Sequence, residues 1–206
     1  MKSEKLMKNK VLLENLEVVV SRHKVLLEAA VLINDSRIED VLVGNYEKRV
    51  DSAVKRIDCS ELIAIPAYLD VLDPSIATFK YHQEFDVAEP SDETVIYLNH
   101  NLAVKLDVFK FDRGYLAFVL KNLYQSQVIL DPSDNSIDKQ AKLLRSMGYP
   151  LTDIAAYTSL NYLEYQAADD RVGNIQKGKQ ANIYLCDKDL NVVAQIIGGR
   201  MHVAVH

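Results

Sequence analysis

The sequence contains no tryptophan and only two cysteines, Cys59 and Cys186, among its 206 residues. The two cysteines lie far apart in the chain, and this pattern favours two buried thiols over a disulfide. No run of about 18 apolar residues is present, which argues against a helical membrane span. Glu14 and Glu17 soon interrupt the apolar run behind the basic start of the chain, which is atypical of a signal peptide. We therefore expect a cytoplasmic protein with no membrane contact.

The sequence also lacks the charge pattern of a nucleic-acid-binding protein. Acidic residues outnumber basic ones by 29 to 24, which gives a formal net charge of −5. No basic cluster interleaved with aromatic residues occurs, so we expect no nucleic-acid partner. A glycine-rich phosphate loop, a Cys-x-x-Cys pair and a nucleophile elbow are absent as well.

What the sequence does contain is an ordinary globular composition, with 49% hydrophobic and 26% charged residues. Near the start, three apolar runs at 11–20, 24–33 and 38–43 are separated by polar turns, which predicts three β-strands. Near the end, apolar runs at 181–186 and 192–197 flank a charged turn, and a third short segment follows a pair of glycines. This pattern predicts a second β-meander, preceded by a turn in which Gly178 has a positive φ.

The middle of the chain has the pattern of strands alternating with helices. It predicts strands at 102–108 and 127–131 and helical regions at 112–125 and 138–160. Asp112 is well placed as an N-cap, because apolar residues at helical spacing follow it. The second helical region is expected to break at Gly148 and to start again at Thr152.

The amino-acid sequences of two segments resemble those of a known family. Residues 173–183 read G-x-I-x-x-G-K-x-A-N-I and lead into the C-terminal meander, and this stretch resembles the C-terminal signature of the amidohydrolase superfamily. The resemblance is strongest to the N-acetylglucosamine-6-phosphate deacetylases. Residues 57–71 are similar to the stretch with which these enzymes enter their barrel. Glu61 and Ala67 stand in place of two glycines there, and Asp70 is retained.

The resemblance implies an α/β fold in which both chain ends build a composite β-sandwich. We expect residues 1–65 and 172–206 to form this sandwich and residues 66–171 to form a truncated β/α barrel-like domain. The barrel should be an incomplete parallel sheet with helices, because a full eight-unit barrel takes about 250 residues. Such a sheet has an open edge. We expect residues 72–100, a second subunit or another protein to cover it.

The resemblance also implies that the metal site of the family has been replaced. Leu72, Ala77 and Lys110 occupy positions at which metal ligands belong, and Ser133 occupies the position of the catalytic aspartate. Hydrolysis of an amide in this family needs a divalent metal that activates water, with a carboxylate within reach as acid and base. We therefore expect no metal site and no cofactor.

Four aspartates remain as catalytic candidates: Asp70, Asp107, Asp131 and Asp134. Their carboxylates could hold a divalent ion if the strands that carry them are adjacent. The alternative, which we favour, is that these residues cap backbone amides at strand ends.

Three functions remain open. The first is a catalytically inactive relative of N-acetylglucosamine-6-phosphate deacetylase that acts as a binding or interaction protein, with an amino-sugar phosphate as a candidate ligand. The second is an active amidohydrolase that cleaves the amide of an N-acetylated amino-sugar phosphate at an atypical site, which would need zinc or iron. The third is a remnant without a present biochemical role. The replaced ligand positions favour the first.

Overall fold

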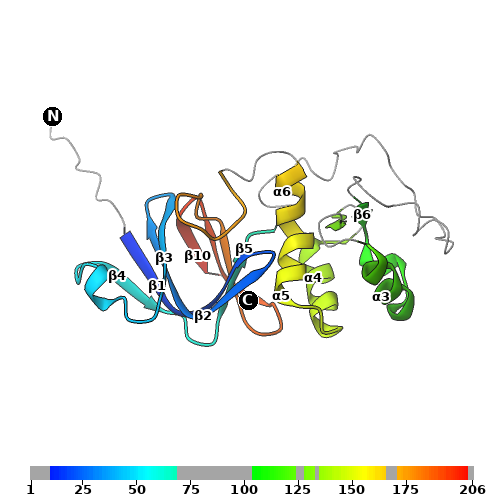
Figure 1. The fold of residues 1–206 in the computed structure, drawn as a ribbon, viewed down its shortest axis with the longest axis horizontal. Coiled ribbons are helices and arrows are strands. Elements are labelled where there is room, and N and C mark those ends of the chain that lie inside the picture. The colour runs from blue at the N-terminus through cyan, green and yellow to red at the C-terminus, as the bar shows by residue number, and fades with distance from the viewer. Residues whose placement is uncertain (1–9, 69–103, 124–127, 133–134, 166–170, 204–206) are drawn as a thin grey trace.

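The computed structural model describes residues 10–68, 104–123, 128–132, 135–165 and 171–203. These residues form an eight-stranded sheet, a separate two-stranded sheet and a set of helices (Figure 1). The large sheet has the strand order β10-β9-β8-β5-β1-β2-β3, and β4 also pairs with β1. Strands from both chain ends therefore share one sheet, as the sequence predicts.

The first half of the large sheet is the predicted N-terminal meander followed by two short strands. The antiparallel strands are β1 (Lys10–Ser21), β2 (Lys24–Asn34) and β3 (Arg37–Val43). A short 3-10 helix, η1 (Glu47–Arg49), follows, and then β4 (Lys55–Asp58) and β5 (Ile63–Pro66) run parallel to β1.

The turn before β5 contains a residue with a positive φ. Glu61, which stands where the family has a glycine, has a φ of 67°. This left-handed region is where glycine is favoured, because a Cβ atom crowds the following carbonyl oxygen there. Glu61 therefore adopts a backbone conformation that glycine takes more readily. Gly178 has a φ of 88°, as predicted.

The second half of the large sheet comes from the C-terminus. Strands β8 (Ile183–Cys186), β9 (Val192–Ile197) and β10 (Arg200–Val203) form the predicted meander. Strand β8 pairs antiparallel with β5, with Ile63 opposite Cys186 and Pro66 opposite Ile183. This pairing joins the two chain ends.

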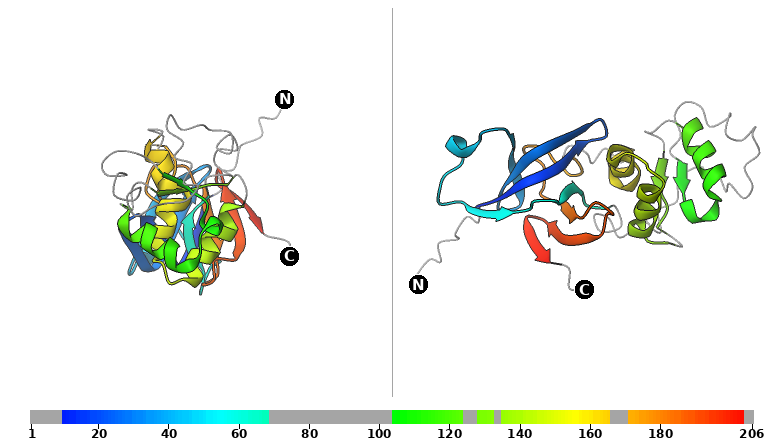
Figure 2. Two further views of the ribbon diagram at one scale, coloured as in Figure 1. Left: turned by 90° about the vertical axis from the view of Figure 1, so that its right-hand side faces the viewer. Right: turned by 90° about the horizontal axis from the view of Figure 1, so that it is seen from below.

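The middle of the chain forms the small parallel sheet and most of the helices. These elements are β6 (Val104–Leu106), the 3-10 turn η3 (Val108–Lys110), α3 (Arg113–Asn122), β7 (Val128–Leu130), α4 (Ile137–Ser146), α5 (Leu151–Ala155), the π-helical turn η5 (Ala156–Leu160) and α6 (Asn161–Tyr165). They lie at one end of the large sheet, with α3 furthest from β1–β3 (Figure 2). None of the described helices has the length and apolar character needed to cross a bilayer.

The helices lie in the predicted regions, but α3 ends at Asn122, before residue 125, and the last helical stretch continues past residue 160 to Tyr165. Asp112 caps α3, because its carboxylate accepts a hydrogen bond of 2.9 Å from the backbone N–H of Tyr115. The break at Gly148 is present. The next helix, however, begins at Leu151 after Pro150, so the prediction of Thr152 as its N-cap is wrong. Proline is well suited to a helix start because its ring fixes φ and it has no N–H to satisfy.

The predicted parallel sheet is present as the pair β6–β7. Among the described residues, these two strands pair only with each other. The segment 57–71, which the resemblance places at the entry into the barrel, overlaps β4 and contains β5, and both strands belong to the large sheet; its residues 69–71 lie outside the described residues. The sequence limits given above for the two domains stay predictions.

Two apolar cores meet at the central strands β5 and β8. Ala64, Ile183 and Leu185 belong to the core enclosed by the large sheet. Their neighbours on the opposite face, including Ile65 and Tyr184, belong to the core shared with the helices. A strand that is buried on both faces reads as a continuous apolar run, which both strands show.

Both cysteines lie within these cores and neither forms a disulfide. Burial raises the pKa of the Cys59 thiol to about 11 and that of the Cys186 thiol to about 12. The prediction of two buried thiols is therefore confirmed. Both thiols stay protonated at neutral pH, which makes them poor nucleophiles.

The β9–β10 turn packs tightly against the β2–β3 turn. A Cβ atom added at Gly199 would lie 1.7 Å from the carbonyl oxygen of Asp35. Nearby, the backbone N–H of Ala181 donates a 2.8 Å hydrogen bond to the carbonyl of Ser36. The C-terminal meander can close on the N-terminal hairpin only because residue 199 has no side chain.

We therefore expect Gly199→Ala to lower the free energy of unfolding by about 3 kcal/mol or more, since the clash is with backbone. Gly44→Ala is the matched control, because Gly44 also has a positive φ, 68°, but nothing lies within 4 Å of the added Cβ. It should cost about 1–2 kcal/mol, the cost of the left-handed conformation alone. Urea denaturation of both variants measures the difference. Equal losses of unfolding free energy would show that a side chain at residue 199 does not clash with the Asp35 backbone.

Candidate functional site

The candidate active site lies at the carboxyl ends of β6 and β7. The strands are parallel and in register, with Leu106 opposite Leu130, and the backbone N–H of Asp131 donates a 2.9 Å hydrogen bond to the carbonyl of Leu106. Asp107 and Asp131, which follow the two strands, are therefore at the same edge of the sheet. In β/α folds this edge is where catalytic residues lie.

Asp107 is buried and has both carboxylate oxygens occupied. Its Oδ1 accepts a 3.0 Å hydrogen bond from the backbone N–H of Phe109, which caps η3. Its Oδ2 accepts a 3.1 Å hydrogen bond from Nδ2 of Asn135. The side chain is 5% exposed. A carboxylate this buried needs such partners, because leaving it without hydrogen bonds would be costly.

Gln140 of α4 connects the loops that follow both strands. Its Oε1 accepts a 3.1 Å hydrogen bond from the backbone N–H of Val108. Its Nε2 donates to the carbonyl oxygens of Asp131 and Asn135. The side chain is completely buried. One amide group thus satisfies three backbone groups at the edge where a catalytic centre would be expected.

Gln140 is a site residue that was not predicted, although the sequence holds a signal for it. Residues Ile137, Ala141 and Leu144 form the buried face of α4, and Gln140 lies on that same face. A polar residue on the apolar face of a helix requires a buried hydrogen-bond partner. Its partners are backbone groups far away in the sequence, so only the structure identifies them.

A second amide holds the opposite end of β7. Nδ2 of Asn161, the first residue of α6, donates a 2.7 Å hydrogen bond to the carbonyl of Val128, and Asn161 is buried. Strand β7 is therefore held by Asn161 at its amino end and by Gln140 just beyond its carboxyl end. Both contacts fix the backbone of a strand that is only three residues long.

The other predicted site residues are distributed as follows. Lys110 ends η3 and is exposed, and Asp131 is partly exposed. Asp70, Asp134, Leu72, Ala77 and Ser133 lie outside the described residues. Within the described ranges, no three histidine, cysteine or acidic side chains gather in a way that could hold a metal ion.

Comparison with known proteins identifies the class of fold. No protein-family model matches the sequence, and no curated protein matches it. Solved structures do match, and the fold is that of the amidohydrolase superfamily. The prediction of a composite sandwich joined to an incomplete set of β/α units is confirmed.

The particular structures it resembles include N-acetylglucosamine-6-phosphate deacetylases. The enzyme from Pasteurella multocida aligns with 95% of this chain and 100% of its own, with a TM-score of 0.60 and 10% identity. A mutant of the Mycobacterium smegmatis enzyme in complex with N-acetyl-D-glucosamine-6-phosphate aligns with 96% of this chain and 100% of its own, with a TM-score of 0.65 and 8% identity.

A β-aspartyl dipeptidase from Fervidobacterium islandicum AW-1 is also similar. It aligns with 96% of this chain and 97% of its own, with a TM-score of 0.57 and 9% identity. At identities this low, the similarity shows a shared fold and nothing about activity, because many different functions use one fold.

The hydrogen bonds of Gln140 lead to a test of its structural role. Gln140→Leu would remove the hydrogen bonds that Gln140 makes with one backbone N–H and two carbonyl groups, so we expect the free energy of unfolding to fall by about 3–5 kcal/mol. Gln176→Leu is the control at an exposed glutamine and should change it by no more than about 0.5 kcal/mol. Chemical denaturation gives both values. A small loss for Gln140→Leu would mean that the network adds little to stability.

Proposed function

We propose that this protein is a catalytically inactive relative of the N-acetylglucosamine-6-phosphate deacetylases that acts as a binding or interaction protein. The observation that carries the proposal is that both carboxylate oxygens of Asp107 accept hydrogen bonds from the protein itself. A general acid or base must reach the substrate and exchange a proton with it. Asp107 is instead buried and hydrogen-bonded through both oxygens to the protein itself. Its contacts are those of a structural cap.

The surrounding residues support the same proposal. The amide of Gln140 makes hydrogen bonds with the loops after β6 and β7. On the family register, Lys110 stands at a metal-ligand position, and its ammonium group would repel a metal cation. Two neutral or cationic side chains thus contribute to an edge where hydrolysis would require metal-binding groups.

The alternative is an active amidohydrolase with an atypical site, and one observation favours it. The parallel pairing of β6 and β7 brings the backbone positions of Asp107 and Asp131 to the same edge. Zinc or iron would be needed there to activate water for attack on the amide. Asp107 would then have to exchange its present partners for the metal.

The proposal also names a candidate ligand and a cellular location. An amino-sugar phosphate is the candidate ligand, because one of the similar structures holds N-acetyl-D-glucosamine-6-phosphate. A cytoplasmic location agrees with two free, buried thiols, since reducing compartments keep cysteines unpaired.

The proposal is tested by the metal content of the purified full chain, measured together with deacetylation of N-acetylglucosamine 6-phosphate under added Zn²⁺, Fe²⁺ or Co²⁺. We expect no bound metal and no turnover above the rate in buffer. Stoichiometric metal together with turnover would overturn the proposal and establish the alternative. In that case Asp107→Asn should abolish turnover, because an amide can neither bear the charge nor accept the proton.

The proposal also includes a partner at the edges of β6–β7, because these strands pair only with each other among the described residues and open sheet edges are normally covered. We expect the full chain to be a homodimer or to bind another protein through this region. Light scattering after size-exclusion chromatography gives the mass. A monomer whose residues 72–100 are cut readily by a protease would contradict this part of the proposal.

A further inference from the structure

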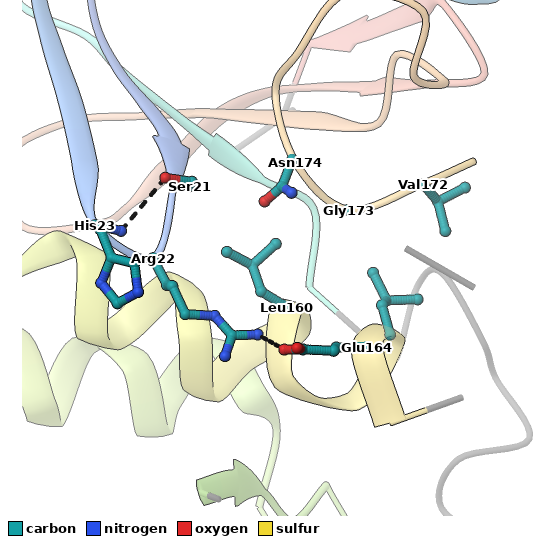
Figure 3. Close-up of a pocket in the computed structure, with 9 residues that line it drawn as sticks. Ser21, Arg22, His23, Leu160, Glu164, Val172, Gly173 and Asn174 are labelled. Atoms are coloured by element: carbon teal, nitrogen blue, oxygen red, sulfur yellow. Dashed lines mark hydrogen bonds and ion pairs between the residues drawn. The ribbon is translucent and has the colours of Figure 1, made fainter. Parts of the chain in front are cut away.

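A pocket of about 300 Å³ lies between the β1–β2 turn, the end of the α5–η5–α6 helix and the loop at residues 172–174 (Figure 3). This volume is at the lower end of the range for small-molecule sites. The residues that line it come from three segments of the chain, at 21–23, 160–164 and 172–174. The fold brings them together, and no sequence motif marks them as a group.

The polar side of the pocket is built on the β1–β2 turn. Arg22 and His23 are consecutive residues of this turn and both line the pocket. The backbone N–H of His23 donates a 3.4 Å hydrogen bond to Oγ of Ser21. Across the pocket, the side chain of Arg22 forms an ion pair with Glu164 of α6 (Figure 3). The pair differs in exposure, at 18% for Arg22 and 59% for Glu164.

The opposite side of the pocket combines an amide with an apolar wall. Asn174 faces the pocket from the loop before β8 (Figure 3). The preceding Gly173 has a φ of 102°, and a Cβ atom there would lie 2.8 Å from Cδ1 of Leu163. The loop therefore approaches the helix as closely as it does because residue 173 is glycine. Leu160, Leu163 and Val172 supply the apolar surface.

The pocket is separate from the edge that carries Asp107 and Asp131. Its helix, α6, begins at Asn161, whose amide contacts the carbonyl of Val128 at the amino end of β7. Asp131 follows the carboxyl end of the same strand. A ligand in this pocket would thus lie at the end of the parallel strands opposite to the candidate active site.

We propose that this pocket binds a small molecule that carries a phosphate or carboxylate group. The planar guanidinium of Arg22 is the side chain best suited to an oxyanion, because it offers several N–H donors in a fixed arrangement. His23 and Asn174 add further donors, and the apolar wall contacts the body of the ligand. Glu164 orients the guanidinium and competes with the ligand for it. This inference does not depend on the function proposed above.

The competition by Glu164 gives a test in which two variants of one ion pair act in opposite directions. Inorganic phosphate and, separately, acetate are titrated into the ¹⁵N-labelled full chain at constant ionic strength. We expect saturable shifts of the backbone amide signals of residues 21–23 and 173–174. Arg22→Gln should weaken binding by about tenfold, since the charged donor is lost. Glu164→Gln should tighten binding about threefold, because the competing charge is removed.

The ion pair is partly exposed, so both variants should fold. Arg49→Gln is the matched control, because Arg49 has a similar ion pair with Asp40 but does not line the pocket. It should leave the affinity unchanged. Binding of phosphate alone would assign a phosphate-bearing ligand, and equal binding of acetate a carboxylate-bearing one.

Three results would overturn the inference. One is the lack of saturable shifts at these amides with either anion. Another is equal weakening by Arg22→Gln and Glu164→Gln, which would show that the ion pair only joins the hairpin to the helix. The last is a loss of affinity in Arg49→Gln as large as that in Arg22→Gln, which would show a nonspecific effect of charge.

Discussion

The pairing of β5 with β1 and β8 is the interaction on which the rest of the structure depends. Strand β5 is four residues long, yet it runs parallel to β1 and antiparallel to β8 and so joins the two chain ends. Its residues also divide between two cores, with Ala64 in the core of the large sheet and Ile65 in the core shared with the helices. Displacing β5 would therefore open both cores. Because these contacts are distant in sequence, a large entropy of loop closure opposes their formation during folding.

The sequence predicts those parts of the fold that local patterns determine. The N-terminal strands follow from alternating apolar runs and polar turns, and α3 follows from the Asp112 cap with apolar residues at helical spacing. The pairing of β5 with β8 was accessible only through the family resemblance, since no local pattern specifies which distant strands become neighbours. Thr152 is a weaker start signal for α5 than Pro150, whose fixed φ suits the beginning of a helix, and α5 begins directly after this proline.

The candidate site was less predictable than the fold because it depends on partners rather than on residue types. The sequence identifies Asp107 as a strand-end carboxylate but cannot show whether its oxygens face a ligand or the protein. In the structure they face Phe109 and Asn135, and Gln140 binds the same loops. Each of these polar groups forms hydrogen bonds within the protein. Breaking these bonds to free a group for catalysis would cost folding free energy. These contacts are the basis of the proposal that the protein binds a ligand or partner and does not hydrolyse an amide.

The central claim is that the carboxyl ends of β6 and β7 form a structural network instead of a metal centre. The most direct measurement is anomalous X-ray diffraction from crystals of the full chain grown with Zn²⁺ and N-acetylglucosamine 6-phosphate. We expect no anomalous peak at this edge, with Asp107 still accepting hydrogen bonds from Phe109 and Asn135. A zinc peak about 2 Å from a carboxylate oxygen of Asp107 or Asp131 would contradict it, because that distance is the length of a zinc–oxygen bond.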